Sequence, residues 1–189
     1  MQIERVVYPV EVLGPGKRLG IWTIGCQKSC PGCISRELWA PNPGKNMPLS
    51  QLIGIAGKII SENKADGITI SGGDPLEQPE ELLQFITAIQ PICDDILIYT
   101  GYTLQELRDS WEKDDLDRLT KNISVLIDGR YVDSLNDNAS PLIGSTNQFI
   151  HFFDESKCHK YEHYCREKGR CVQNIFSGKT LVSIGIPGK

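Results

Sequence analysis

Long apolar runs, an excess of positive charge and a secretion signal are all lacking in this sequence of 189 residues. No stretch of about 18 apolar residues could cross a bilayer, so we expect no membrane span. The formal net charge is −4, and phosphate binding needs clustered lysines and arginines, which argues against a nucleic-acid partner. The first residues show no basic segment followed by an apolar core, and we expect a cytoplasmic protein.

Cysteine, by contrast, is frequent, and the count of seven leaves at least one thiol unpaired in any disulfide scheme. Without a secretory signal, metal ligation is the more natural use of so many thiols. Cys26, Cys30 and Cys33 lie within eight residues, residues 26–33, which we call the cysteine loop. Three thiolates can hold a [4Fe–4S] cluster with one iron left open, whereas electron-transfer clusters usually use four. Zinc is the alternative, but nothing near the loop supplies a matching second pair of ligands.

Apolar, β-branched runs alternate with segments of helical periodicity along most of the chain. Strands are predicted at residues 19–25, 67–71, 96–100, 123–128 and 147–153, and helices at residues 50–60, 79–89, 104–108 and 114–119. Ser50 and Thr103 are the predicted helix caps. This alternation calls for right-handed crossovers and a parallel sheet.

The number of strand–helix units sets the predicted architecture. Four or five units are too few to close an eight-stranded barrel. The predicted fold class is therefore α/β, with a partial, open β/α barrel in residues 1–153. Residues 154–189 are predicted to form a small α/β extension of the same domain.

Glycine-rich or polar turns follow four of the predicted strands. The carboxyl ends of parallel strands share one edge, where ligands gather. The cysteine loop, Gly72 with Gly73, Gly101 with Tyr102, and residues 128–130 should therefore meet at one rim. For the Gly-Gly-Asp-Pro turn alone, a plain strand-to-helix turn would be the simpler interpretation, but its place after the second strand favours a ligand-binding role.

These motifs resemble the radical S-adenosylmethionine superfamily, which has the spacing Cys-x3-Cys-x2-Cys after the first strand and a Gly-Gly-acid-Pro turn after the next. Within it, the sequence is similar to the activating proteins of anaerobic ribonucleotide reductases. The similar segments are GPGKRL from Gly14, CPGC from Cys30, SGGDPL from Ser71, YTGYT from Tyr99, LIDGRY from Leu126 and LIGSTNQ from Leu142. Together they cover about residues 12–150, in order.

The resemblance implies a chemistry and a set of partners. The open iron would bind S-adenosylmethionine, and reductive cleavage would give methionine and a 5′-deoxyadenosyl radical. That radical would take a hydrogen atom from a backbone glycine of a large partner enzyme, such as an anaerobic ribonucleotide reductase, with a flavodoxin or ferredoxin as electron donor. The alternatives are a small radical enzyme that modifies a peptide or metabolite and, from a different class, an iron–sulfur electron-transfer module.

The resemblance also assigns residues to the cofactor. They are Ser71, Gly72, Gly73, Asp74, Thr100, Tyr102, Asp128 and Arg130. For Thr100 and Tyr102 the alternative is an ordinary strand-end turn. For Asp128 and Arg130 it is a helix-capping aspartate beside a surface arginine.

A second concentration of ligand types lies in the last part of the chain. Cys158, Cys165 and Cys171, with His163, could hold an auxiliary iron–sulfur cluster or a zinc ion. Their spacings match no compact metal motif, so reduced cysteines on a helix that packs against the barrel are the alternative. Helix is predicted at residues 154–168, followed by short β-like runs at residues 172–176 and 180–184. Cys93 is predicted to be an ordinary buried thiol.

Overall fold

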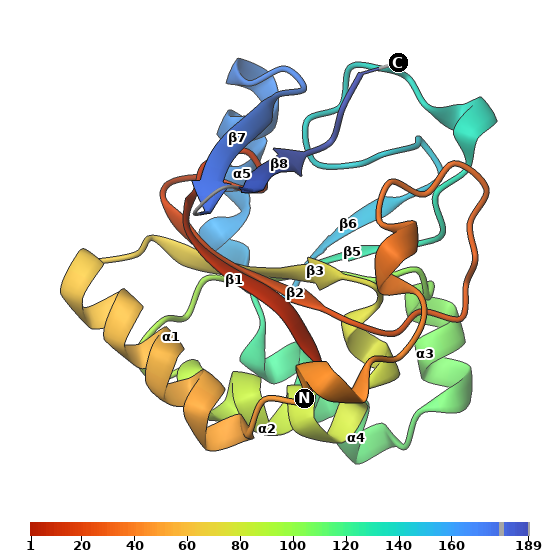
Figure 1. Cartoon of the computed structure of the whole chain (residues 1–189). Coiled ribbons are helices and arrows are strands. Elements are labelled where there is room, and N and C mark those ends of the chain that lie inside the picture. Colours follow the sequence, from red (N-terminus) through yellow and green to blue (C-terminus); the bar gives the residue numbers. More distant parts are fainter. Residues whose placement is uncertain (178–179, 189) are drawn as a thin grey trace.

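A six-stranded sheet forms the centre of the computed structural model, which describes residues 1–177 and 180–188 (Figure 1). The strand order is β1-β2-β3-β4-β5-β6. The four inner strands are parallel and the two edge strands are antiparallel to their neighbours. Their bounds are β1 Ile3–Val10, β2 Arg18–Thr23, β3 Gly67–Gly72, β4 Ile96–Tyr99, β5 Val125–Asp128 and β6 Phe149–Phe152.

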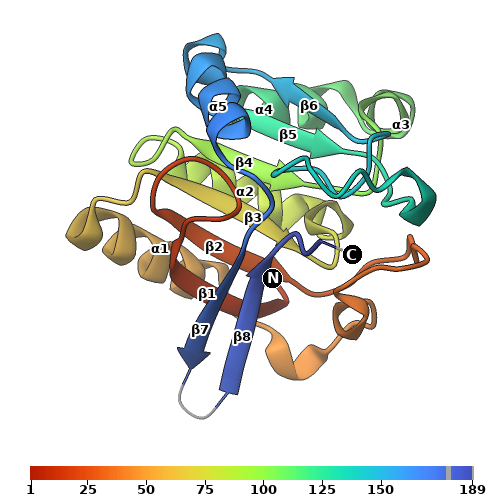
Figure 2. The same ribbon diagram turned by 90° about the horizontal axis from the view of Figure 1, so that it is seen from above.

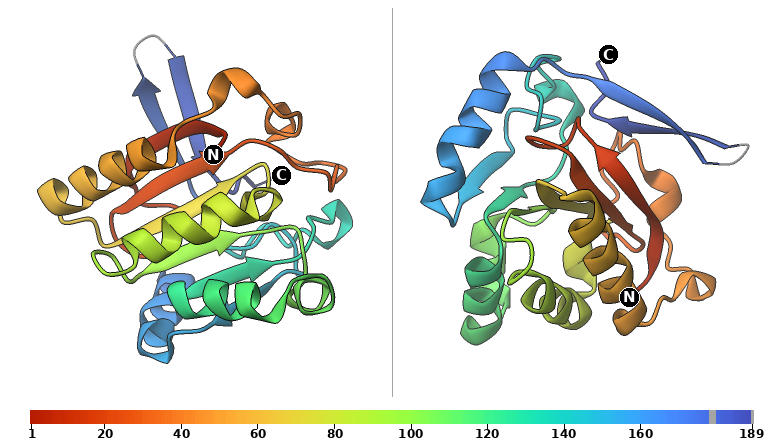
Figure 3. Two further views of the ribbon diagram at one scale, coloured as in Figure 1. Left: turned by 90° about the horizontal axis from the view of Figure 1, so that it is seen from below. Right: turned by 90° about the vertical axis from the view of Figure 1, so that its left-hand side faces the viewer.

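Helices cover one face of this sheet (Figure 3). They are α1 Leu49–Asn63, α2 Pro79–Ile89, α3 Leu104–Ser110 and α4 Lys113–Asn122. Single 3-10 turns occur at Arg36–Leu38, Pro43–Lys45, Pro75–Glu77 and Asp133–Leu135. Helix α5, Glu155–Glu167, and a hairpin of β7, Val172–Ser177, and β8, Thr180–Gly185, lie on the opposite side (Figures 1 and 2). This arrangement confirms the predicted α/β class and is consistent with a partial, open barrel.

The main core lies between the sheet and the first four helices. Strand residues such as Leu19 and Ile68 are fully buried against helix residues such as Leu52 and Ile86. Burying each of these side chains stabilises the fold by roughly 1.5–3 kcal/mol. The core therefore holds the strands in place, while their carboxyl ends remain free to carry loops.

The expected elements and the structure differ at two points. Strand β1 was not among the predicted strands, and it pairs antiparallel with β2 at the sheet edge. Its residues are mostly half-buried rather than alternately buried and exposed, so it lacks a clear period-2 pattern. The predicted cap at Ser50 is wrong, because α1 begins at Leu49 directly after Pro48 and has no side-chain cap. Thr103 does cap α3, in a capping box with Glu106.

A buried ion pair fastens α5 to the amino ends of the strands. Arg18 is fully buried; its Nε donates to Thr69 Oγ1 at 2.7 Å and its Nη2 lies 3.2 Å from Asp95 Oδ1. From α5, Tyr161 and Lys160 each donate to the Asp95 carboxylate at 2.6 Å.

No helix among the described residues combines the length and apolarity needed to cross a membrane.

Candidate functional site

The turn after β3 packs against the strand end that leads into the cysteine loop. The amide of Gly73 donates to Thr23 O at 2.9 Å, and the amide of Asp74 donates to Gly25 O at 2.8 Å. A Cβ at Gly72 would clash with the backbone of Thr23, and one at Gly73 would clash with the carbonyl of Gly25. Both glycines are thus needed for two backbones to approach this closely.

Lys28, inside the cysteine loop, connects that loop to the next two turns. Its Nζ donates to Glu77 Oε1 at 2.8 Å and lies 3.2 Å from the centre of the Tyr102 ring. Its side chain is only 7% exposed. Burial alone would lower the pKa of Lys28, but its bonds to Glu77 and Tyr102 and the nearby charge of Asp74 raise it. Sequence reasoning missed Lys28 and Glu77; the one signal was a basic residue between two cysteines.

Asp74 and Thr100 join the ends of β3 and β4. The Asp74 carboxylate is buried and accepts bonds from the Thr100 hydroxyl at 2.9 Å, from the amide of Gly101 at 2.9 Å and from the amide of Leu76 at 3.0 Å. Burial raises the pKa of Asp74, while these bonds and Lys28 oppose the rise. The two side chains that the resemblance assigned to the cofactor are thus bonded to each other and to the backbone of the rim.

Asp128, at the end of β5, is bonded to neighbouring protein groups and does not line the cavity. It is buried, and its carboxylate accepts from the amide of Leu104 at 2.6 Å and from that of Phe149 at 3.3 Å, and lies 2.9 Å from His151 Nε2. Arg130 is exposed and lies 3.1 Å from Glu106. This geometry corresponds to the alternative of a helix-supporting aspartate beside a surface arginine.

The three thiols of the cysteine loop are free and half-buried. The loop curls through a bond from the amide of Cys33 to Cys30 O at 3.1 Å, and the amide of Ser35 donates to Cys33 Sγ at 3.4 Å. Soft thiolates with backbone N–H bonds to sulfur fit an iron–sulfur cluster better than a hard cation. Among the described residues, no three His, Cys, Asp or Glu side chains could hold a single metal ion, the loop cysteines included. A cuboidal cluster does not require the three thiols to converge on one point, because each thiolate binds a different iron at its own corner of the cube.

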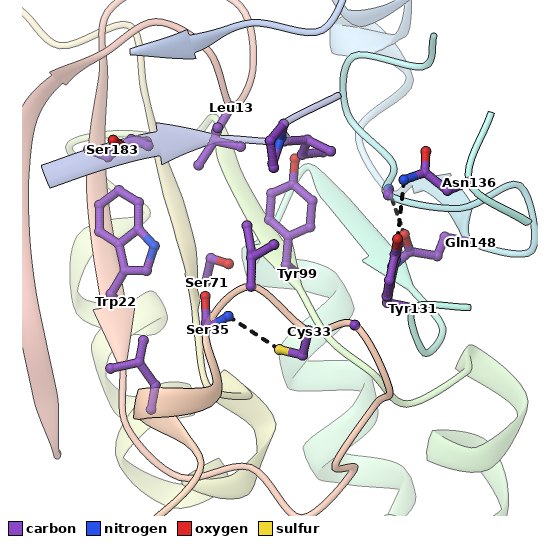
Figure 4. Close-up of a pocket in the computed structure, with 18 of the residues that line it drawn as sticks. Leu13, Trp22, Cys33, Ser35, Ser71, Tyr99, Tyr131, Asn136, Gln148 and Ser183 are labelled. Atoms are coloured by element: carbon purple, nitrogen blue, oxygen red, sulfur yellow. Dashed lines mark hydrogen bonds between the residues drawn. The ribbon is translucent and has the colours of Figure 1, made fainter. Parts of the chain in front are cut away.

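A cavity of about 450 Å³ lies beside this loop, on the open side of the sheet (Figure 4). Cys33 and Ser71 line it, together with the aromatic side chains of Trp22, Tyr99 and Tyr131. The Tyr99 hydroxyl is buried and lacks a hydrogen-bond partner within the described residues. Burial raises the pKa of Tyr99 far above its ordinary value, so this group remains a neutral donor. The hydroxyl itself is enclosed by protein atoms, so Tyr99 contributes its ring, and not its hydroxyl, to the wall of the cavity.

The structure brings the four predicted strand-end motifs together at one rim. Ser71 is the predicted cofactor residue that also lines the cavity. The others hold the rim together or face solvent, as described above. Tyr99 was part of a similar segment but was not itself assigned to the site, because a strand-end tyrosine is as often a core residue.

The cysteines of the C-terminal extension have separate surroundings in the described part of the chain. Cys158 contacts Glu162 at 3.5 Å, Cys165 packs beside the cluster that contains Tyr161, and Cys171 is exposed directly before β7. They belong to no group of three ligands that could hold a metal ion. The alternative of reduced cysteines therefore agrees better with the geometry. Cys93 is buried, as predicted.

An open β/α sheet with a three-cysteine loop and a glycine turn at one rim defines an iron–sulfur enzyme of the radical S-adenosylmethionine class. Residues 12–151 match the family described as "4Fe-4S single cluster domain". The chain is 33% identical over 150 residues to the anaerobic ribonucleoside-triphosphate reductase-activating protein of Escherichia coli (strain K12), a match that covers 76% of this chain and 94% of that relative.

Two further relatives carry the same description. The protein of Vibrio cholerae is 33% identical over 156 residues, covering 77% of this chain and 95% of the relative. That of Enterobacteria phage T4 is 30% identical over 141 residues, covering 71% and 84%. The chain belongs to the family of anaerobic ribonucleoside-triphosphate reductase-activating proteins, as its motifs predicted.

Proposed function

We propose that this chain generates a glycyl radical in a partner enzyme, an anaerobic ribonucleoside-triphosphate reductase. Cys26, Cys30 and Cys33 are the proposed ligands of a [4Fe–4S] cluster with one open iron, where S-adenosylmethionine would bind. The observation that carries the proposal is the cysteine loop itself. It is fastened by Lys28 and by the turn after β3, and Cys33 lies on the wall of a cavity of about 450 Å³.

When bound, the cluster and S-adenosylmethionine together supply a one-electron cleavage to methionine and a 5′-deoxyadenosyl radical. The chain's own residues position the reactants and exclude water. Trp22, Tyr99 and Tyr131 contribute aromatic walls to the cavity, while the hydroxyl of Ser71 offers a hydrogen bond to a ribose or a carboxylate. Backbone groups of Gly72 and Gly73 are the proposed contacts to the methionine part.

The proposed partner follows from the relatives, whose printed names describe activation of that reductase. The proposed electron donor is a flavodoxin or ferredoxin. The cavity lies on the open side of the sheet, where a loop of another protein can approach it. This position favours a protein substrate over a free metabolite.

The test begins with protein that is reconstituted with iron and sulfide without oxygen. We expect about four irons per chain, a change of the electron-spin spectrum on adding S-adenosylmethionine, 5′-deoxyadenosine after reduction, and a glycyl signal on the reductase. Cys30→Ser should abolish each of these four results, and the matched variant Cys158→Ser should leave all of them unchanged. Deoxyadenosine without any glycyl signal would contradict the proposed partner, and no cleavage at all would contradict the proposed enzyme.

A further inference from the structure

The C-terminal extension forms one wall of the cavity. Residues 183–188 line it. Ser183 lies on the side away from Cys33 and Tyr131 (Figure 4), and Pro187 shares the Arg170 guanidinium with Asn136, the neighbour of Tyr131. In Figure 2 the chain after β8 runs back over the open face of the sheet, toward the loop that contains the cysteines. This extension begins beyond residues 12–151, which the family match covers. The wall is therefore a feature of this chain in addition to the shared core.

The hairpin that leads into this wall is firmly attached. The Gln173 side chain accepts from the amide of Glu11 at 3.0 Å and donates to Pro9 O at 2.9 Å. Ile184 is 3% exposed and lies in the hydrophobic cluster that contains Trp22. Strand β8 is thus fixed against the edge of the sheet as far as this isoleucine.

The segment after β8, residues 186–188, is attached through Arg170. The Arg170 side chain is 4% exposed, and its Nη1 donates to Pro187 O at 3.3 Å. The same guanidinium donates to Ser140 O at 3.1 Å and to Gly144 O at 3.1 Å. One buried cation therefore connects the end of the chain to the loop that forms the neighbouring wall.

The size of the cavity limits what it can hold. Ligand pockets of about 300–1,000 Å³ take a single drug-sized molecule, and this one is about 450 Å³. The proposed reaction requires the cofactor and a protein backbone at the same place, with reacting atoms roughly 3–3.5 Å apart. A cofactor that fills the cavity therefore requires residues 186–188 to move before that backbone can enter.

We propose that residues 186–188 are a strap that closes the cavity around the cofactor, and that Arg170 is its latch. The strap swings out when a protein loop enters. This inference rests on the proposed function, because it concerns how the partner's glycine reaches the site. The strap is held by the packing of Ile186 against the Trp22 cluster and by the Arg170 bond to Pro187, and neither contact is part of the sheet, so the strap can move without breaking the sheet.

The energetic consequence is a lower apparent affinity for the partner. A site that is competent only when open has an apparent dissociation constant raised by the reciprocal of the open fraction. Releasing the strap should therefore lower the KM for the reductase about threefold to tenfold, and should leave kcat within about twofold because the chemistry is unchanged.

Two variants test this, with a matched control. One ends at Gly185, and the other is Arg170→Met in the full chain. The control is Arg166→Met, at an exposed arginine in the last turn of α5. Both test variants should lower KM, and the control should not. Arg170→Met also frees the loop around Gly144. If the KM values of the two test variants disagree, the value of the shortened chain is therefore the one that decides. A KM that rises in the shortened chain would mean that the segment is part of the docking surface, and would overturn the strap.

A second measurement needs no partner and no cluster. In a Trp39→Phe, Trp111→Phe background, Trp22 reports on the cavity that it lines, and acrylamide is the probe. Quenching of Trp22 should increase at least twofold in the shortened chain and stay unchanged in Arg166→Met. Unchanged quenching in the shortened chain would overturn the strap. A full-length protein that never yields a glycyl signal counts against the proposed function, and the strap is then judged by quenching alone.

Discussion

Lys28 and Tyr102 are in direct contact, with the Lys28 ammonium 3.2 Å from the centre of the Tyr102 ring. The two residues come from different turns, one within the cysteine loop and one after β4. The same ammonium bonds Glu77, from the turn after β3. A single cation thus sets the position of the cysteine loop relative to the two neighbouring turns at the rim.

Lys28→Met removes that cation. The variant loses a partly desolvated cation–π contact worth about 1–2 kcal/mol and leaves Glu77 unpaired. A shift of about 1 Å in a positioning element can cost about a hundredfold in rate, so we expect cofactor cleavage to fall at least tenfold while about four irons per chain remain. Deoxyadenosine formation and iron content are the measurements. Lys121→Met, on an exposed face of α4, is the control, and an unchanged cleavage rate in Lys28→Met would contradict the positioning role.

Asp74→Asn should destabilise the protein. The amide brings two donors to a position where the carboxylate now accepts from Thr100, Gly101 and Leu76. At least one buried N–H loses its acceptor, which costs about 1–3 kcal/mol. In a chain of this size each kcal/mol lowers Tm by roughly 2–4 °C. Thermal unfolding measures this, with Thr100→Ser as the variant that keeps the hydroxyl; equal Tm values for Asp74→Asn and the parent would contradict the bonding described.

Tyr99→Phe should change neither stability nor cofactor affinity. The Tyr99 hydroxyl is buried without a partner in the described structure, so its removal should not destabilise the cofactor-free protein. The hydroxyl is also closed off from the cavity, so the affinity for S-adenosylmethionine should stay within about twofold of the parent. A spectroscopic titration of the cluster-loaded protein gives the affinity. A tenfold loss of affinity would contradict the enclosed position of this hydroxyl.

Replacing Cys158, Cys165 and Cys171 together by serine should leave the metal content unchanged. The three thiols lie in separate surroundings and form no metal-binding group in the described part of the chain. Quantitation of iron and zinc after reconstitution is the measurement. A fall from about eight irons to four, or a loss of zinc, would instead establish a second metal site in the extension.

Asp95→Asn should make stability less dependent on pH. Burial alone would raise the pKa of Asp95, but the charge of Arg18 and the bonds from Arg18, Lys160 and Tyr161 more than offset this and lower it below 3.8. A folded pKa below the unfolded one contributes stability at neutral pH, and this contribution is lost as pH falls through the folded value. The amide leaves buried Arg18 without its charge partner, at a cost of about 3–5 kcal/mol.

Urea unfolding between pH 7 and pH 3 measures how the unfolding free energies of the parent and of Asp95→Asn depend on pH. The gap in unfolding free energy between the parent and Asp95→Asn should be widest at neutral pH and should narrow below about pH 4. Asp94→Asn is the matched control, because its exposed pair with Lys157 contributes at most about 1 kcal/mol. A gap that stays constant across this range would show that Asp95 is not the charged partner of Arg18.

Local patterns were enough to predict much of this protein. Thiol spacing, helical periodicity and turn residues depend on neighbours along the chain, so the cysteine loop, α2 and the Thr103 cap follow from the sequence by itself. So does the meeting of the strand-end turns, since parallel strands that are linked by helices share one carboxyl edge.

Contacts between distant segments depended on the tertiary structure. Lys28 and Glu77 are 49 residues apart, and Arg18 and Asp95 are 77 apart. Which side chains meet across such distances is set by strand register and by the direction of each loop, and no local pattern carries that information. The same holds for Arg170, which is an ordinary basic residue in the sequence. Folding buries it and brings its guanidinium to Pro187 and Gly144, at the wall of the cavity.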